Sequence, residues 1–239
     1  MAVTVVTGGS RGIGASTCVQ LARAGHDVVV GFHHDEAAAA AVAQQVRDLG
    51  RKALAARVDT ASSASVQALF AAAAALGQVT GLVNNAGIIE GRGTLVEVSE
   101  ADIRRVIEVN VLGAIFCAQE AIRVMTAGGG GSIVNVSSGA ATLGSPGEYV
   151  HYAVSKGALD TLTIGLSKEL GAAGIRVNTV SPGVINTEIH EPGRLERVGP
   201  LAPLGRAGEP DEVAAAIVWL LSDEASYVTG ANLRVAGGR

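Results

Sequence analysis

The fold is decided near the amino terminus, where residues 3–14 read Val-Thr-Val-Val-Thr-Gly-Gly-Ser-Arg-Gly-Ile-Gly. The β-branched run is typical of a buried strand, and it leads into a glycine-rich turn followed by a helical pattern. Glycines at such a turn let the backbone approach a pyrophosphate, which then sits at the amino end of the helix. We therefore predict a phosphate-binding loop, and its candidate ligands are Gly8, Ser10, Arg11, Gly12, Ile13 and Gly14.

Short β-branched runs and longer Ala/Leu-rich helical patterns alternate along the rest of the chain, which indicates crossover units and a parallel sheet. The expected strands are 3–7, 27–32, 53–58, 80–84, 132–137, 175–180 and 232–235. The expected helices are 12–24, 36–49, 62–76, 99–126, 150–172 and 209–222. No linker divides the pattern, so residues 1–239 are predicted to form a single Rossmann-type, doubly wound α/β domain.

Length and composition exclude several classes of protein. The 239 residues are 48% apolar and 17% charged, which excludes a disordered chain or a coiled coil. A net charge of −4 offers no basic stripe, so nucleic acid is not an expected partner. Cys18 and Cys117 lie in apolar helical patterns without metal-like spacing, which indicates core residues of a reduced compartment and no metal site. We find no leader or membrane-spanning run and expect a cytoplasmic protein with no membrane partner.

The end of the second strand bears on the choice of cofactor. NAD-specific folds usually carry an acid there for the ribose hydroxyl, and this chain has Phe32. With Arg11 in the loop and His33 and His34 beyond the strand, the local charge favours NADP(H) over NAD(H). Asp35 and Glu36 are the opposing evidence, and we interpret them as residues that cap the next helix.

Polar or small residues also follow the other strands. They are Asp59 and Thr60 after strand three, Asn84, Ala86 and Gly87 after strand four, Ser138 after strand five, and Pro182, Gly183, Ile185 and Thr187 after strand six. Taken singly, each is more typical of a turn than of a binding site. The carboxyl ends of parallel strands share one edge of a sheet, so their convergence predicts a site along that edge.

Tyr152 and Lys156 are four residues apart and therefore share one face of a predicted helix. Lowering the pKa of a phenol by about three units requires roughly 4 kcal/mol in favour of the phenolate. An ammonium about 5 Å away would supply about 3 kcal/mol at an effective dielectric of ~20. We therefore expect Lys156 to lower the pKa of Tyr152, the candidate proton donor.

Strand six is followed by an irregular polar stretch at about residues 186–207, a candidate substrate lid. Charged or titratable residues near the site are expected to be solvated surface instead of substrate contacts. They are Glu90, Arg92, His151, His190, Arg194 and Arg206.

Together these residues resemble the classical short-chain dehydrogenase/reductase family over essentially all of residues 2–238. The marks are Thr7-Gly8-x-x-x-Gly12-Ile13-Gly14, Asp59, Asn84-Asn85-Ala86-Gly87, Asn110, Ser138, Tyr152-x-x-x-Lys156 and Pro182-Gly183. Residues 143–149 also resemble a glucose or ribitol dehydrogenase-like branch. Two features depart from many members: the stretch between Ser138 and Tyr152 is slightly longer, and Ala236 stands where members more often have Asp or Asn.

The resemblance implies a seven-stranded sheet in the order 3-2-1-4-5-6-7, a nicotinamide cofactor and a homo-oligomer, usually a tetramer, with a homodimer as the alternative. It also implies that Lys156 holds the nicotinamide ribose, Ser138 bonds the substrate oxygen and Asn110 supports a proton relay. Ile185 and Thr187 would meet the carboxamide and the phosphates.

Our hypothesis is an NADP(H)-preferring oxidoreductase that interconverts a carbonyl and a secondary alcohol on a small substrate. The alternatives are a 3-oxoacyl carrier-protein reductase, a sugar or polyol dehydrogenase, and a non-catalytic NADP(H)-sensing protein. The carrier-protein reductase ranks lower because residues 125–131 supply no cations for an acidic carrier.

Overall fold

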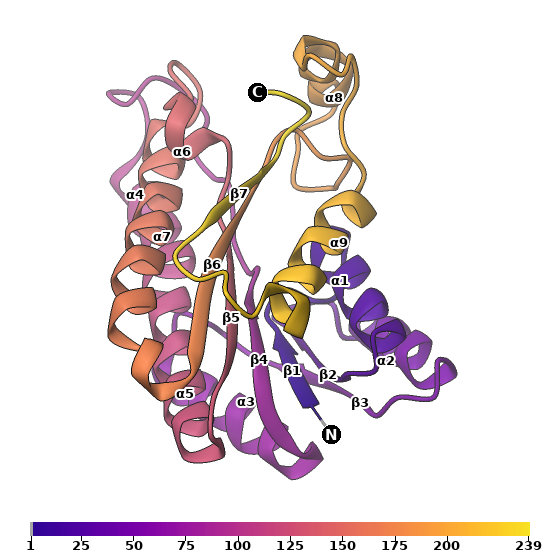
Figure 1. The fold of residues 1–239 in the computed structure, drawn as a ribbon. Helices are drawn as coiled ribbons and strands as arrows, with labels where there is room; N and C mark the ends of the chain where they lie inside the picture. Colours follow the sequence, from indigo (N-terminus) through magenta and orange to yellow (C-terminus); the bar gives the residue numbers. More distant parts are fainter. Residues whose placement is uncertain (1) are drawn as a thin grey trace.

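Strands and helices alternate along residues 2–239, the part of the chain that the computed structural model describes (Figure 1). The strands are β1 (Ala2–Val6), β2 (Asp27–Phe32), β3 (Ala53–Arg57), β4 (Gln78–Asn84), β5 (Gly131–Val136), β6 (Ile175–Pro182) and β7 (Asn232–Val235). They form one sheet in the order β3-β2-β1-β4-β5-β6-β7, with every neighbouring pair parallel. The predicted fold class and strand order are confirmed.

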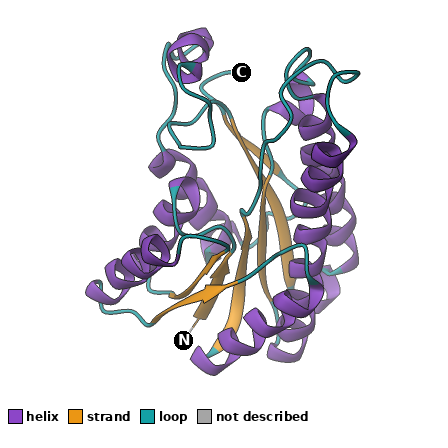
Figure 2. Ribbon diagram, turned by 180° about the vertical axis from the view of Figure 1, so that it is seen from behind, coloured by secondary structure: helices purple, strands orange, loops and turns teal. Residues whose placement is uncertain are grey.

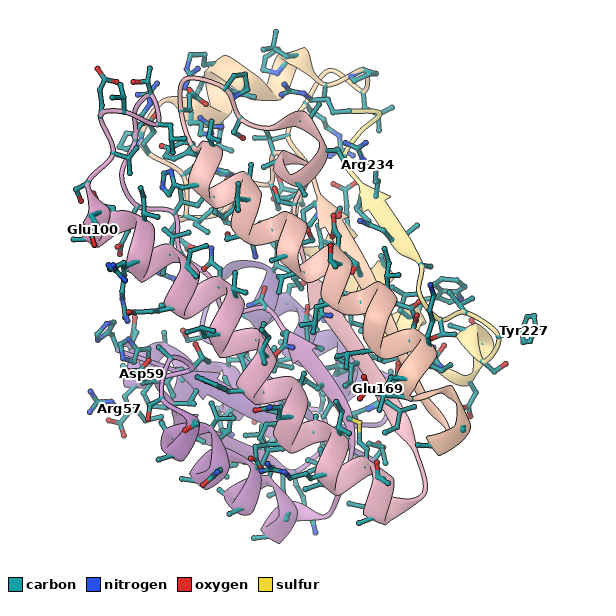
Figure 3. The ribbon with its side chains drawn as sticks, turned by 90° about the vertical axis from the view of Figure 1, so that its left-hand side faces the viewer. Arg57, Asp59, Glu100, Glu169, Tyr227 and Arg234 are labelled. Atoms are coloured by element: carbon teal, nitrogen blue, oxygen red, sulfur yellow. The ribbon has the colours of Figure 1, made fainter. Side chains whose placement is uncertain are left out.

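The helices cover both faces of the sheet (Figures 1 and 2). They are α1 (Gly12–Arg23), α2 (Glu36–Asp48), α3 (Ser63–Leu76), α4 (Glu100–Ile107), α5 (Gly113–Gly128), α6 (Ala140–Leu143), α7 (Val150–Glu169), α8 (Arg194–Val198) and α9 (Pro210–Leu221). Helices α1, α2 and α9 bury one apolar cluster against the sheet, and α3 and α5 bury another on the opposite face. Figure 3 shows α7 beside the α4–α5 segment on that second face.

Short polar side chains begin several of these helices. Asp35 accepts a hydrogen bond from the Ala38 N–H (2.9 Å), and Ser62 and Ser99 cap α3 and α4 in the same way. Such caps satisfy backbone donors that have no partner within the helix. The interpretation of Asp35 as a helix cap is therefore confirmed.

The expected helix 99–126 contains a π-helical turn, Glu108–Leu112, between α4 and α5. A π turn inserts one extra residue and shifts the apolar pattern by one position, which the expectation of a continuous helix did not include. The expected helix 150–172 ends at Glu169 and is followed by a short 3-10 turn.

Two further expectations about loops were incomplete. The segment 186–207 is not wholly irregular, because it contains α8 and a 3-10 turn, and its ends are joined by a parallel bridge between Ile185 and Gly208. Helix α6, after β5, was not expected. Both short helices carry too few residues for a periodic pattern.

Both cysteines are buried and free, as predicted. The helical stretch Glu100–Gly128 is long and apolar enough to span a membrane by length and composition, with a mean hydropathy of 1.3. Within it, α5 buries Cys117, Ala121 and Met125 in the core cluster on the sheet. Core helices of globular proteins commonly have this composition.

His26 provides a test of the folded state at the amino end of the sheet. Its Nδ1 lies 2.9 Å from Thr4 Oγ1, and burial, followed by the Arg51 charge, lowers its pKa. The unfolded chain therefore binds more protons in acid, and the free energy of unfolding should fall as the pH drops below about 6.5, by at most about 1.4 kcal/mol per pH unit. Urea titrations between pH 5 and 8 should show this slope reduced in His26→Asn and kept in the exposed His34→Asn. An unchanged slope in His26→Asn would contradict the assignment.

Candidate active site

The loop between β1 and α1 is held in a shape that only glycine permits at several positions. Gly8 and Gly12 have φ angles of 63° and 52°, in the left-handed region. A Cβ added at Gly14 would lie 2.1 Å from the Gly8 carbonyl oxygen. The loop therefore packs directly against the first turn of α1, and the helix begins without a side-chain cap on its free N–H groups.

Thr7 and Asn85 lock this loop to the end of β4. Asn85 Nδ2 donates to the carbonyl oxygens of Thr7 (3.0 Å) and Gly8 (2.9 Å). Thr7 Oγ1 accepts from the backbone N–H groups of Asn85 and Ala86, both at 3.1 Å. Neither Thr7 nor Asn85 was among the predicted site residues, although both lie inside motifs that the sequence singles out.

Tyr152 and Lys156 lie on α7, and both side chains are buried. Lys156 Nζ donates to the Val136 carbonyl oxygen (2.8 Å) and lies 5.8 Å from the centroid of the Tyr152 ring. The Ser138 hydroxyl, at the end of β5, hydrogen-bonds the Tyr152 phenol. The structure thus brings together the three residues that the sequence predicts as the core of the site.

The expected effect of Lys156 on the Tyr152 phenol was wrong for this structure. Burial raises the pKa of Tyr152 to about 12, although the Ser138 hydrogen bond and the Arg194 charge act to lower it. Burial also lowers the pKa of Lys156 to about 8. Desolvation disfavours the charged form of each group and is the largest cause of both shifts, while the Asp160 charge acts to raise the pKa of Lys156.

Asn110 lies on the π-helical turn behind these residues. Its Oδ1 accepts from the Ile88 N–H (2.8 Å), and its Nδ2 donates to Ile88 O and Ser155 Oγ, both at 3.0 Å. A Cβ at Gly87 would lie 3.3 Å from both Asn110 Oδ1 and Lys156 Nζ. Gly87 therefore leaves room beside the buried polar groups.

A cavity of about 520 Å³ opens above this group. The predicted site residues that line it are Ile13, Gly87, Ser138, Tyr152, Lys156, Pro182, Gly183, Ile185 and Thr187. Its remaining walls include Asn85, α6, the loop before α7 and the segment 186–207. The carboxyl ends of β1, β4, β5 and β6 thus meet at one cavity, as the strand-end argument predicts.

A family model described as enoyl-(acyl carrier protein) reductase matches residues 8–239. The chain belongs to the short-chain dehydrogenase/reductase family. The model spans the whole cavity-forming region, from the glycine loop to the end of the chain.

Relatives and solved structures support the same family. The chain is 49% identical to an uncharacterized oxidoreductase, YgfF, of Escherichia coli (strain K12), covering 100% of both. It is 43% identical to a cis-4-hydroxycyclohexanecarboxylate dehydrogenase of Sinomonas cyclohexanicum (99% of this chain, 95% of the other). It is 41% identical to an L-rhamnose 1-dehydrogenase (NAD(P)(+)) of Azotobacter vinelandii (98% and 94%). A crystal structure of a short-chain type dehydrogenase/reductase from Mycobacterium marinum superposes with a TM-score of 0.93 at 33% identity, covering 99% of this chain and 94% of that one.

The chain is therefore an oxidoreductase of this family that acts on alcohol or ketone substrates. The family binds NAD(P)(H), and the residues present fit such a dinucleotide. The glycine loop leaves the amino end of α1 accessible to phosphate, and Gly87 leaves a space beside Lys156 that a side chain would fill.

Some predicted binding residues lie outside the cavity wall. Asn84 is buried and donates to Ala114 O and Asn135 Oδ1, so it pins neighbouring elements. Asp59 accepts from the Ala61 N–H in the turn after β3, beside the exposed Arg57 (Figure 3), and Thr60 packs on Gly113. Their contacts are those of turn and packing residues.

Three of the residues expected to be solvated surface are buried or line the cavity. His151 is 4% exposed, and its Nε2 lies 2.6 Å from the Glu90 carbonyl oxygen. Arg194 has a side chain only 15% exposed and lines the cavity, as does His190. Helical geometry turns His151 away from Tyr152, but the loop after β4 covers it, and the sequence does not show that contact.

We expect Gly14→Ala to abolish cofactor binding and to destabilise the protein. The new Cβ would collide with the Gly8 carbonyl, and overpacking of this kind typically destabilises by about 1–3 kcal/mol. Gly165→Ala on α7 is the matched control, because its Cβ would meet nothing within 4 Å. NADPH fluorescence titration and urea unfolding measure both effects. Normal NADPH affinity in Gly14→Ala would refute the role of this contact.

Proposed function

We propose that the protein is an NADP(H)-preferring oxidoreductase that interconverts a carbonyl and a secondary alcohol on a small substrate. The observation that supports this most directly is the Tyr152 phenol, hydrogen-bonded to Ser138 and beside Lys156 at the cavity wall. Tyr152 is the proposed proton donor in reduction and acceptor in oxidation.

The buried phenol is well suited to donate a proton. With a pKa of about 12, it is fully protonated at neutral pH, and removing its proton at pH 7 requires roughly 7 kcal/mol. An alkoxide that forms within hydrogen-bond distance is a stronger base than the phenolate and takes the proton. The bound nicotinamide supplies the hydride in reduction and accepts it in oxidation.

The neighbouring residues orient this transfer. Ser138 hydrogen-bonds Tyr152, and we propose that it also holds the substrate oxygen. Lys156 keeps a positive charge beside the phenol, which stabilises the phenolate left after donation. We propose that Asn110, which is bonded to Ser155 and the backbone at Ile88, supports the route by which Tyr152 regains its proton.

NADP(H) preference is supported by the charges around the end of β2. Phe32 is 5% exposed and belongs to the core, so no carboxylate from this position opposes a 2′-phosphate. The His33 and His34 rings lie 3.9 Å apart, and Arg57 Nε donates to the His33 carbonyl oxygen (3.2 Å). Together with the exposed Arg11, these groups offer donors to a phosphate.

The cavity favours a small substrate with apolar parts. Its walls include Ile89, Leu143, Val184 and Leu201, whose apolar side chains would contact the carbon skeleton of a substrate. One relative is a cis-4-hydroxycyclohexanecarboxylate dehydrogenase, and a cyclohexane ring suits such walls. We therefore rank the 3-oxoacyl carrier-protein reductase and the sugar or polyol dehydrogenase below an oxidoreductase for small, partly apolar substrates.

The proposal also covers the substrate lid, the domain organisation and the oligomeric state. Segment 186–207 forms part of the cavity wall, and we propose that it is the substrate lid, within one catalytic domain over residues 1–239. A cytoplasmic homotetramer, or a homodimer, stays a prediction.

Replacing Tyr152 by Phe removes the proton and leaves the ring. We expect kcat for NADPH-dependent carbonyl reduction to fall about 10²–10⁴-fold, while the Kd for NADPH changes less than about twofold. The control is Tyr227→Phe, whose side chain is fully exposed and projects from the side of the molecule (Figure 3). Undiminished turnover in Tyr152→Phe would reject Tyr152 as the donor. If the unmodified protein reduces no compound in a panel of carbonyls, the result would favour the alternative of a non-catalytic NADP(H)-sensing protein.

Replacing Arg11 by Gln removes one cation from the loop. We expect the Kd for NADPH to rise about tenfold, or about 1.4 kcal/mol, and the Kd for NADH to change little. Arg23→Gln, at the far end of α1, should leave both unchanged. Equal losses for both nucleotides would show that Arg11 does not select the 2′-phosphate.

A further inference from the structure

Arg194 is the first residue of α8, and the structure places its charge inside the substrate cavity. Its guanidinium carbon lies 5.4 Å from the centroid of the Tyr149 ring. Nη1 donates to Glu148 Oε2 (2.6 Å), and the side chain is only 15% exposed. An ion pair and an aromatic ring together restrict the orientation of this mostly buried guanidinium.

Arg194 belongs to an ion cluster that is not neutral. Glu148 accepts from Arg92 (3.2 Å), Arg194 (2.6 Å) and Arg197 (3.1 Å), and Glu191 pairs with Arg92 and Arg197. Three guanidinium groups thus meet two carboxylates, which leaves one positive charge in excess. The hydrogen bond from Arg194 is the largest of the causes that hold the pKa of Glu148 below its usual range, so its carboxylate stays ionised and bonded to these arginines.

The excess positive charge extends over the cavity wall. The charged side chains that line the cavity are Glu148, Lys156, Arg194, Arg197 and Arg239. Four of these five are cations, although the chain as a whole carries a net charge of −4. A concave surface of this kind with low-dielectric walls attracts anionic ligands.

Among these cations, Arg194 combines a mostly buried side chain with donors that remain unused by its ion pair with Glu148. Arg194, His190 and Tyr152 line the same cavity, and the Arg194 charge acts to lower the pKa of both Tyr152 and His190. Lys156 is bonded to the Val136 carbonyl oxygen beneath the cavity. Within residues 2–239 the Arg194 guanidinium makes one hydrogen bond, through Nη1, so its Nε and Nη2 donors remain for a ligand.

We propose that the substrates of this site carry a carboxylate in addition to the carbonyl or alcohol, and that Arg194 binds this carboxylate. The proposal rests on the proposed function and specifies its substrate class. A guanidinium with two free donors can hold a carboxylate through two parallel hydrogen bonds. Tyr152 and Arg194 then fix the two polar ends of the molecule, and the apolar walls contact the carbon skeleton between them.

The same charges favour a small anion over an acidic protein. Arg194 is mostly buried and can be reached only by a ligand inside the cavity. Arg92 and Arg197, about half exposed, are bonded to Glu148 and Glu191. An acidic carrier protein would therefore meet neutralised pairs at the rim.

The test compares a keto acid with its neutral analogue, 4-oxocyclohexanecarboxylate and 4-oxocyclohexanecarboxamide, in NADPH-dependent reduction. We expect kcat/KM to be at least about tenfold higher for the acid in the unmodified protein. Arg194→Gln should bring the two values within about twofold of each other by lowering that of the acid alone. Arg92→Gln is the matched control: it removes another partner of Glu148 but does not line the cavity, and it should keep the preference.

Binding without turnover gives an independent measure. Cyclohexanecarboxylate should bind to the NADPH-loaded protein at least about tenfold more tightly than cyclohexanecarboxamide in calorimetry, and Arg194→Gln should remove the difference. Equal values for acid and amide in the unmodified protein would overturn the inference while leaving the proposed function intact. Equal losses for both compounds in Arg194→Gln would assign Arg194 a structural role only and would also overturn the inference.

A neutral acetoacetyl thioester provides a further comparison. If it supports faster NADPH oxidation than the keto acid, the result would favour the carrier-protein alternative and contradict the inference.

If neither ketone is reduced and no other carbonyl is, the proposed function fails. In that case the calorimetric comparison still decides whether Arg194 binds carboxylates.

Discussion

Two amide hydrogen bonds hold the first loop of this protein to its fourth strand. Asn85 donates to the carbonyl oxygens of Thr7 and Gly8, and through them it fixes the glycine turn whose last glycine, Gly14, contacts Gly8 directly. The connection is possible because β1 and β4 are neighbours, so that strands far apart in sequence end side by side. The amino end of α1 and the wall of the cavity both take their positions from this contact.

Burial then determines the chemistry of the groups at that edge. The same desolvation that keeps the Tyr152 phenol protonated also weakens the charge of Lys156, because each charged form is removed from water. The site therefore holds a protonated phenol and a lysine whose pKa of about 8 lies close enough to neutral pH for neighbouring charges to change its protonation. Bound charges in the cavity act strongly here, since little solvent screens them.

The segment between β6 and α9 has a different role from the sheet edge. Its ends are joined by the bridge between Ile185 and Gly208, and its charged face meets the loop before α7 through Glu148. The sheet edge supplies the geometry of a strand-end site, whereas this segment and its arginines supply the charge of the cavity mouth. Reaction type and substrate choice thus depend on separate parts of the chain.

The sequence by itself determined the alternation of strands and helices, the glycine loop and the Tyr152–Lys156 pair, because these depend on local periodicity and on spacing within one element. It also predicted that strand ends would converge, since parallel strands require it. Only the tertiary structure decided the π turn under Asn110, the burial of His151, the inward position of Arg194 and the raised pKa of Tyr152. Each of these depends on which distant segment covers a residue and excludes water from it, and no pattern within a single element records that contact.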